Sequence, residues 1–127
     1  MQANEHEEVI EKYIAAYNTF DVDGMLKLLL PGVRFENWSS GHLTTEASGI
    51  EEFRQLAEQA KTMFSEREQR VTALKQGVHS VIVSIAYRGQ LAVDIPDGPR
   101  AGTVLDMNGE SEFSFEGWQI SKIVDRS

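Results

Sequence analysis

A carboxylate near the end of the sequence is the strongest candidate for acid–base chemistry. Asp125 lies in segment 119–125, where the pattern is typical of a β-strand. A carboxyl group enclosed by apolar walls has a raised pKa, which brings it into the range useful to a general base. The alternative interpretation is that Asp125, followed by Arg126 and Ser127, lies at a frayed strand end outside any pocket.

Polar side chains on other predicted elements could complete a site around Asp125. Tyr13 and Asn37 are the candidates for holding a substrate oxygen, although a tyrosine can simply pack in the core and an asparagine can satisfy strand-end backbone groups. A few polar groups within apolar walls suit a small hydrophobic molecule that carries one or two oxygens. The other candidate ligand-binding residues are Tyr17, Phe20, Phe35, Phe53, Leu56, Ile85, Tyr87, Met107, Ser111, Phe113 and Ile123.

Several other chemistries have no support in the sequence. The three histidines have no neighbours suited to a metal site or a catalytic triad. No phosphate loop, dinucleotide-binding fingerprint or nucleophile elbow is found. The chain contains no cysteine, which excludes disulfides and thiolate chemistry. We therefore expect neither a metal nor a cofactor.

Charge and hydropathy narrow the classes of partner. The 12 basic and 20 acidic residues give a net charge of −8, which repels nucleic acid and anionic lipid. No apolar run approaches the ~20 residues that span a bilayer, and residues 1–8 are acidic and lack the basic region and apolar stretch that are typical of a signal peptide. We expect a cytoplasmic protein that binds neither nucleic acid nor membrane.

The length of 127 residues and the 41% hydrophobic content predict one domain over residues 1–127.

Three helices are predicted in the first half of the sequence. Apolar residues three and four apart indicate an amphipathic helix over 7–20. Asp21 is placed to cap a second, short helix with an apolar pattern at 25–30, which Pro31-Gly32 ends. The third helix has its apolar stripe over 50–64, and Ser48, followed three residues later by Glu51, has capping-box spacing at its start.

Strands dominate the rest of the sequence. Alternation over 33–40 predicts a strand, and the turn Gly41-His42 leads into a second one that ends near Ala47. Helices followed by a run of antiparallel strands predict an α+β fold with helices on one face of a curved sheet. Four longer strands are predicted at 69–75, 78–93, 103–115 and 119–125, with turns at 76–77, 96–99 and 116–117.

Alternation also assigns the faces of these strands. In segment 103–115, Ser111 is predicted to face inward and Glu110 outward, unless a bulge at Gly109 turns an acidic residue toward the pocket. Trp38 is predicted to face away from the pocket, beside Val104 and Ile82. It would then serve as a dimer contact or pack under a loop.

The whole order of elements resembles the nuclear transport factor 2-like superfamily, and within it the SnoaL-like polyketide cyclase branch. The residues that carry the resemblance are Tyr13-Ile14, the segment Phe20-Asp21-Val22-Asp23-Gly24, and segments 33–37 and 109–120. It implies a cone-shaped, cystatin-like fold in which three N-terminal helices pack on a strongly curved, mainly antiparallel sheet. It also implies an apolar pocket at the wide end and a homodimer formed through the outer sheet face.

The resemblance also shows where this chain departs from its relatives. Ketosteroid isomerases are similar in having a tyrosine at the position of Tyr13, but their base falls on Asn37 and their second acid on Ser111. The cyclases likewise have their carboxylate at the position of Ser111. Limonene epoxide hydrolases share Asn37 and one aspartate at Asp125, whereas their tyrosine, arginine and second aspartate fall on Phe35, Ile85 and Tyr87.

Members of the superfamily use this pocket for isomerisation, cyclisation or hydrolysis, or for protein binding without chemistry, so the fold does not determine the function. The resemblance implies a SnoaL-like protein that binds a small hydrophobic oxygenated molecule, with acid–base chemistry carried by Asp125, Tyr13 and Asn37. The alternative is a ligand-binding or protein-interaction module without catalysis.

Overall fold

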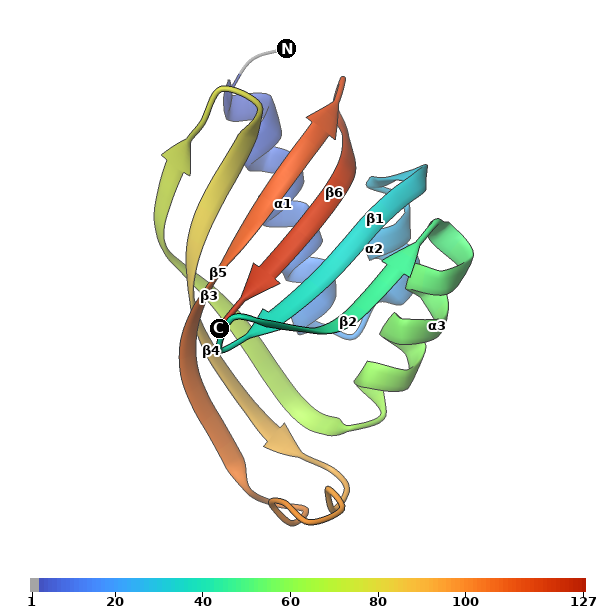
Figure 1. The fold of residues 1–127 in the computed structure, drawn as a ribbon, viewed down its shortest axis with the longest axis vertical. Coiled ribbons are helices and arrows are strands. Elements are labelled where there is room, and N and C mark those ends of the chain that lie inside the picture. The colour runs from blue at the N-terminus through green and yellow to red at the C-terminus, as the bar shows by residue number, and fades with distance from the viewer. Residues whose placement is uncertain (1–2) are drawn as a thin grey trace.

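The sheet curves around the helices, which lie on one of its faces (Figure 1). The computed structural model describes residues 3–127. Its elements are α1 (Ala3–Asn18), α2 (Val22–Leu26), β1 (Leu29–Ser39), β2 (His42–Ser48), α3 (Ile50–Lys61), β3 (Phe64–Gln76), β4 (Ser80–Leu91), β5 (Val104–Glu116) and β6 (Gln119–Arg126). The α+β class and the helices-first order were therefore predicted correctly.

The six strands form one sheet in the order β2-β1-β6-β5-β4-β3. Strand β1 runs parallel to β6, and all other neighbouring strands are antiparallel. The last strand in sequence therefore lies between β1 and β5. Residues near the C-terminus, including Asp125, are consequently placed in the middle of the sheet.

Helix α1 packs against the sheet through the apolar stripe that the sequence predicts. Ile10 and Tyr13 are buried in one cluster with strand residues such as Phe113. The helix ends at Asn18, whose side chain makes two hydrogen bonds to the backbone of Gln69 on β3. These bonds fix the end of α1 against the sheet.

Helix α2 is shorter than predicted. Asp21 caps it by accepting a hydrogen bond from the Gly24 N–H at 2.9 Å, as expected. The helix ends at Leu26, however, and Leu29 already pairs with Ile120 on β6. The apolar pattern of residues 25–30 favours a helix, but pairing with β6 draws Leu29 into a strand. A pairing with such a distant segment cannot be read from the local pattern.

Helix α3 begins at Ile50, but its predicted capping box is wrong. The N-cap is Gly49, which has a φ of 89° and provides no side-chain hydrogen bond. The carboxylate of Glu52, not of Glu51, accepts a hydrogen bond from the Ser48 N–H. Glycine is favoured at this φ because other residues would be strained there.

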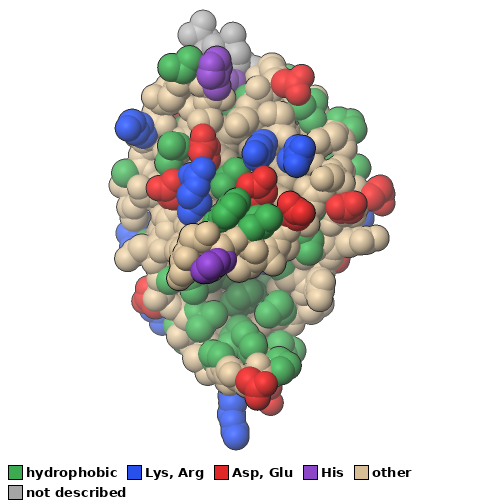
Figure 2. Space-filling model, viewed as in Figure 1, with side chains coloured by type: hydrophobic (Ala, Val, Ile, Leu, Met, Phe, Trp, Pro, Cys, Tyr) green, Lys and Arg blue, Asp and Glu red, His purple; other side chains and the backbone are tan. Residues whose placement is uncertain are grey.

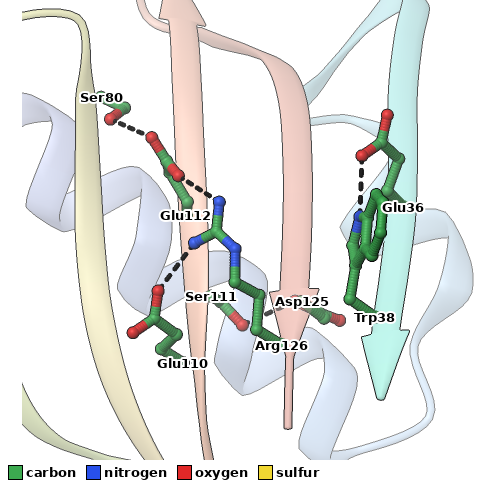
Figure 3. Close-up of polar contacts among 8 residues, drawn as sticks. All are labelled: Glu36, Trp38, Ser80, Glu110, Ser111, Glu112, Asp125 and Arg126. Carbon is green, nitrogen blue, oxygen red and sulfur yellow. Dashed lines mark hydrogen bonds and ion pairs between the residues drawn. The ribbon is translucent and has the colours of Figure 1, made fainter. Parts of the chain in front are cut away.

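Strands β4, β5 and β6 begin and end within two residues of their predicted bounds, but β3 begins at Phe64 and not at 69, because helix α3 ends at Lys61. The register between β4 and β5 runs without a shift, so the bulge considered at Gly109 is not present. Glu110 and Glu112 therefore lie on the outer face, where each carboxylate contacts the Arg126 guanidinium at 2.7 Å (Figure 3).

The sequence predicted that Trp38, Val104 and Ile82 lie side by side on the outer face of the sheet. In the structure, charged side chains surround Trp38 instead. Trp38 donates a hydrogen bond to Glu36 on the same strand at 2.9 Å (Figure 3). Charged side chains gather over the upper part of this face, and hydrophobic ones are grouped toward its lower end (Figure 2). Trp38 is in register with Arg126, and Arg126 with Glu110, six positions along β5 from Val104. Trp38 and Val104 therefore do not form one patch.

Among the described residues, no helix is both long enough and apolar enough to cross a membrane.

Candidate functional site

A cavity of about 600 Å³ opens on the helix side of the sheet. This volume falls within the range of sites that bind small molecules. Its lining comes from α1 to α3 and from all six strands. The predicted site residues found in the lining are Tyr13, Tyr17, Phe35, Asn37, Phe53, Leu56, Ile85, Tyr87, Met107, Ser111 and Asp125.

Three predicted ligand-binding residues lie outside the cavity lining. Phe113 and Ile123 are 1% exposed and belong to the core, where the Phe113 ring meets the Tyr13 ring edge-on at 5.6 Å. Both face inward, but they lie one inward-facing position beyond Ser111 and Asp125, in the part of the sheet that packs with α1. Phe20 follows α1 with a φ of 60° and does not reach the cavity wall.

Asp125 on β6 lies in the lining of the cavity. Its Cα is in register with Asn37 on β1 and with Ser111 on β5. Its Oδ1 atom accepts a hydrogen bond from the Ser111 hydroxyl at 2.6 Å (Figure 3). Strand β6 continues through Arg126, so Asp125 is held in the sheet and is not a frayed end.

Burial controls the acidity of Asp125. The surrounding protein desolvates the carboxylate and raises its pKa from 3.8 to about 6, while the hydrogen bond from Ser111 acts in the opposite direction. At neutral pH the group is therefore mostly ionised but close to its pKa. These properties suit a group that both removes and returns a proton.

Asn37 lines the cavity, but its side chain is already engaged. The side-chain amide nitrogen donates a hydrogen bond to the Thr44 hydroxyl at 2.8 Å, and this hydroxyl donates to the backbone carbonyl of Asn37 at 3.0 Å. Asn37 therefore joins β1 to β2. This arrangement matches the alternative given for Asn37 above, in which the side chain satisfies groups at the strand end and does not hold a ligand.

The tyrosines of the cavity remain protonated at neutral pH. Burial, and secondly the charge of Asp125, raises the pKa of Tyr13 well above its ordinary value. Desolvation also raises the pKa values of Tyr17 and Tyr87, and the Tyr17 hydroxyl donates a hydrogen bond to that of Tyr87 at 3.3 Å. The Tyr13 hydroxyl has no hydrogen bond to any residue that the structure describes, so it is available as a donor to a ligand oxygen.

Arg67 on β3 is a cavity residue that the sequence reasoning missed. It is 6% exposed, and its Nε donates a hydrogen bond to the Tyr17 carbonyl at 2.9 Å. Its Cζ lies 3.7 Å from the centroid of the Tyr17 ring and 4.5 Å from that of Phe20. Within residues 3–127, no carboxylate lies within 4.0 Å of this guanidinium. The alternation of β3, extended back from Val71, could have revealed it.

Gly109 provides the space in which the end of β6 lies against β5. A Cβ atom at this position would lie 2.5 Å from the Arg126 carbonyl oxygen. We expect Gly109→Ala to displace the end of β6 and lower the free energy of unfolding by about 1–3 kcal/mol. Urea denaturation measures this loss. Gly32→Ala is the matched control, because a Cβ there has no atom within 4 Å, and equal stability of the two variants would contradict the prediction.

No group of three or more His, Asp or Glu side chains in the described part of the chain is arranged to hold a metal ion.

Comparison with known proteins identifies the class. A family model of the SnoaL-like domain matches residues 10–123, and the chain therefore belongs to the SnoaL-like family. No match was found among curated proteins.

Solved structures agree with this assignment at the level of the fold. The chain is similar to a proposed polyketide cyclase from Xanthomonas campestris (17% identity, TM-score 0.82, covering 98% of this chain and 90% of that one). It is also similar to a proposed SnoaL-like polyketide cyclase from Jannaschia (16%, 0.81, 96% and 84%). A third match is a protein with a ketosteroid isomerase-like fold from Catenulispora acidiphila (14%, 0.77, 93% and 83%). The predicted fold class is thus confirmed.

Proposed function

We propose that this SnoaL-like protein binds a small hydrophobic oxygenated molecule in its cavity and that Asp125 transfers a proton on it. The observation that carries the proposal is a carboxylate on the cavity wall whose desolvation raises its pKa to about 6. A base with a pKa near the working pH is both available and strong enough to accept a proton.

The register of the sheet gives further support. The resemblance to ketosteroid isomerases and cyclases places their carboxylates at positions 37 and 111, which are Asn37 and Ser111 in this chain. Asp125 on β6 is paired with both positions. This protein therefore has its carboxylate on the strand between the two usual ones, facing the same cavity.

The chemistry that this arrangement suits is proton transfer next to a carbonyl group. The Asp125 carboxylate takes a proton from the C–H, and the electron pair of that bond moves to the carbonyl oxygen to give an enolate. The Tyr13 hydroxyl, which burial keeps protonated, donates a hydrogen bond to this oxygen. Asp125 then returns the proton to carbon, either at the same atom or at a conjugated one.

The engagement of Asn37 favours a second candidate function. Asn37, one of the three polar residues predicted to act in catalysis, is hydrogen-bonded to Thr44. Fewer groups are then free to act on a substrate, so the alternative function is ligand binding without chemistry. A ligand that binds the folded state alone raises the melting temperature whether or not it reacts.

Deuterium exchange into model ketones tests both functions without knowledge of the natural ligand. Apolar ketones and 1,3-diketones are incubated with the protein in D₂O, and loss of the acidic C–H signal is followed by proton NMR. We expect exchange faster than in buffer with the same amount of acetate. Compounds that raise the melting temperature without exchanging would support the binding function instead, and compounds that do neither would contradict both functions.

A further inference from the structure

We infer that Arg67 makes the cavity selective for an apolar ligand that carries a negative charge on oxygen, such as a carboxylate or an ionised enol. The inference rests on the proposed function of the cavity as a ligand site, and it adds the charge class of the ligand.

Arg67 is a buried cation without a charged partner among the described residues. Its contacts are one backbone carbonyl and the faces of the Tyr17 and Phe20 rings. A guanidinium has five N–H donors, and the structure assigns only the Nε–H, to the Tyr17 carbonyl. The terminal nitrogens of Arg67 are not fully enclosed by the described residues, so an anionic ligand in the cavity can pair with them, and a paired charge is favoured over an unpaired one at a site of low exposure.

No other charged group of the described cavity lining can pair with an anionic ligand. The Arg126 guanidinium contacts Glu110 and Glu112 on the outer face. The tyrosines near Arg67 are neutral, because burial raises their pKa values. Arg67 is therefore the one cation of the described cavity lining that remains for a ligand.

Asp125 and Arg67 lie on different strands of the cavity lining, β6 and β3. Asp125 is in register with Ser111, whereas Tyr87, whose hydroxyl contacts Tyr17 beside Arg67, is in register with Met107. Ser111 and Met107 are four residues apart on β5, which corresponds to ~13 Å along a strand. A ligand that pairs with Arg67 and reacts at Asp125 therefore has to reach groups on two different strands of the lining.

A guanidinium is well suited to this recognition. Its planar fork binds the two oxygens of a carboxylate with parallel hydrogen bonds, which a neutral amide of the same shape cannot match. Charged hydrogen bonds of this kind correspond to about a 10- to 100-fold change in affinity. The cavity should therefore discriminate between two ligands that differ in charge alone.

The experiment compares naphthalene-2-carboxylate with naphthalene-2-carboxamide by calorimetric titration at neutral pH. We expect the wild-type protein to prefer the carboxylate by about 10- to 100-fold and Arg67→Met to lose this preference. Arg70→Met is the matched control, since Arg70 lies on the same strand with an exposed side chain. It removes the same charge from the protein and should leave the preference unchanged.

Further variants keep the test decisive. Asp125→Asn should retain the preference, so a failure of the proposed catalysis remains distinguishable from a failure of charge selection. If Arg67→Met does not fold, the Nε–H signal of Arg67, identified by its absence in Arg67→Lys, should shift with the carboxylate and not with the amide. Equal affinity for both probes, no binding of the carboxylate at millimolar concentration, or an unchanged preference in a folded Arg67→Met would overturn the inference.

Discussion

Replacing Asp125 with asparagine is expected to lower the rate of C–H exchange by about 10²- to 10⁴-fold. The amide has nearly the shape of the carboxylate, and its oxygen can still accept the hydrogen bond from Ser111 that is now 2.6 Å long. It cannot, however, accept a proton from carbon. The variant should therefore bind the ligand with similar affinity while kcat falls, as NMR exchange rates measured across ligand concentrations would show.

The control for this variant is another aspartate. Asp106→Asn changes the net charge by the same amount at an exposed position of β5, and it should exchange protons at the wild-type rate. Undiminished exchange in Asp125→Asn would show that another group is the base.

The same substitution is expected to stabilise the protein at neutral pH. The folded-state pKa of Asp125 is about 6, and its ordinary value is 3.8. The folded state therefore favours the protonated form. The stability that Asp125 contributes is fully present below pH 3.8 and is lost as the pH rises through 6.

Asparagine does not titrate, so the variant does not lose this contribution. The free energy of unfolding of Asp125→Asn, minus that of the wild type, should rise by on the order of 2–3 kcal/mol from acidic to neutral pH. Urea denaturation of both proteins across this range measures the difference. The pKa values of Glu36 and Glu112 are lowered by their hydrogen bonds and ion pairs, and these groups are common to both proteins, so their effects cancel. A difference that is independent of pH would contradict the prediction.

These two expectations together separate function from folding. A substitution that removes a necessary but costly group should raise stability while it lowers activity. Loss of exchange in a variant that is more stable at neutral pH cannot be attributed to unfolding.

Local pattern was sufficient for much of the fold. The apolar stripe of α1, the cap at Asp21 and the alternation of β5 each depend on neighbours in sequence, and each prediction is confirmed. The helical pattern over residues 25–30 was wrong beyond Leu26, because Leu29 pairs with Ile120 far along the chain. The position of β6 between β1 and β5 likewise depends on long-range pairing.

Regular alternation along the strands was also enough to predict part of the candidate site, but not Arg67. Asp125 and Ser111 lie on strands whose alternation is regular, and the structure brings them together. Arg67 was missed because it stands between Glu66 and Glu68, in a segment whose charges resemble those of a solvated loop. It becomes an inward-facing residue because β3 begins at Phe64 and pairs with β4 throughout.

The most direct test of the central claim is the pKa of Asp125 itself. Its side-chain carboxyl carbon can be followed by ¹³C NMR as a function of pH, and the signal is assigned by its absence in Asp125→Asn. We predict a midpoint near 6, well above the ordinary value of 3.8. A midpoint at or below 3.8 would show a solvated or ion-paired carboxylate, and the acid–base role proposed for the cavity would then be contradicted.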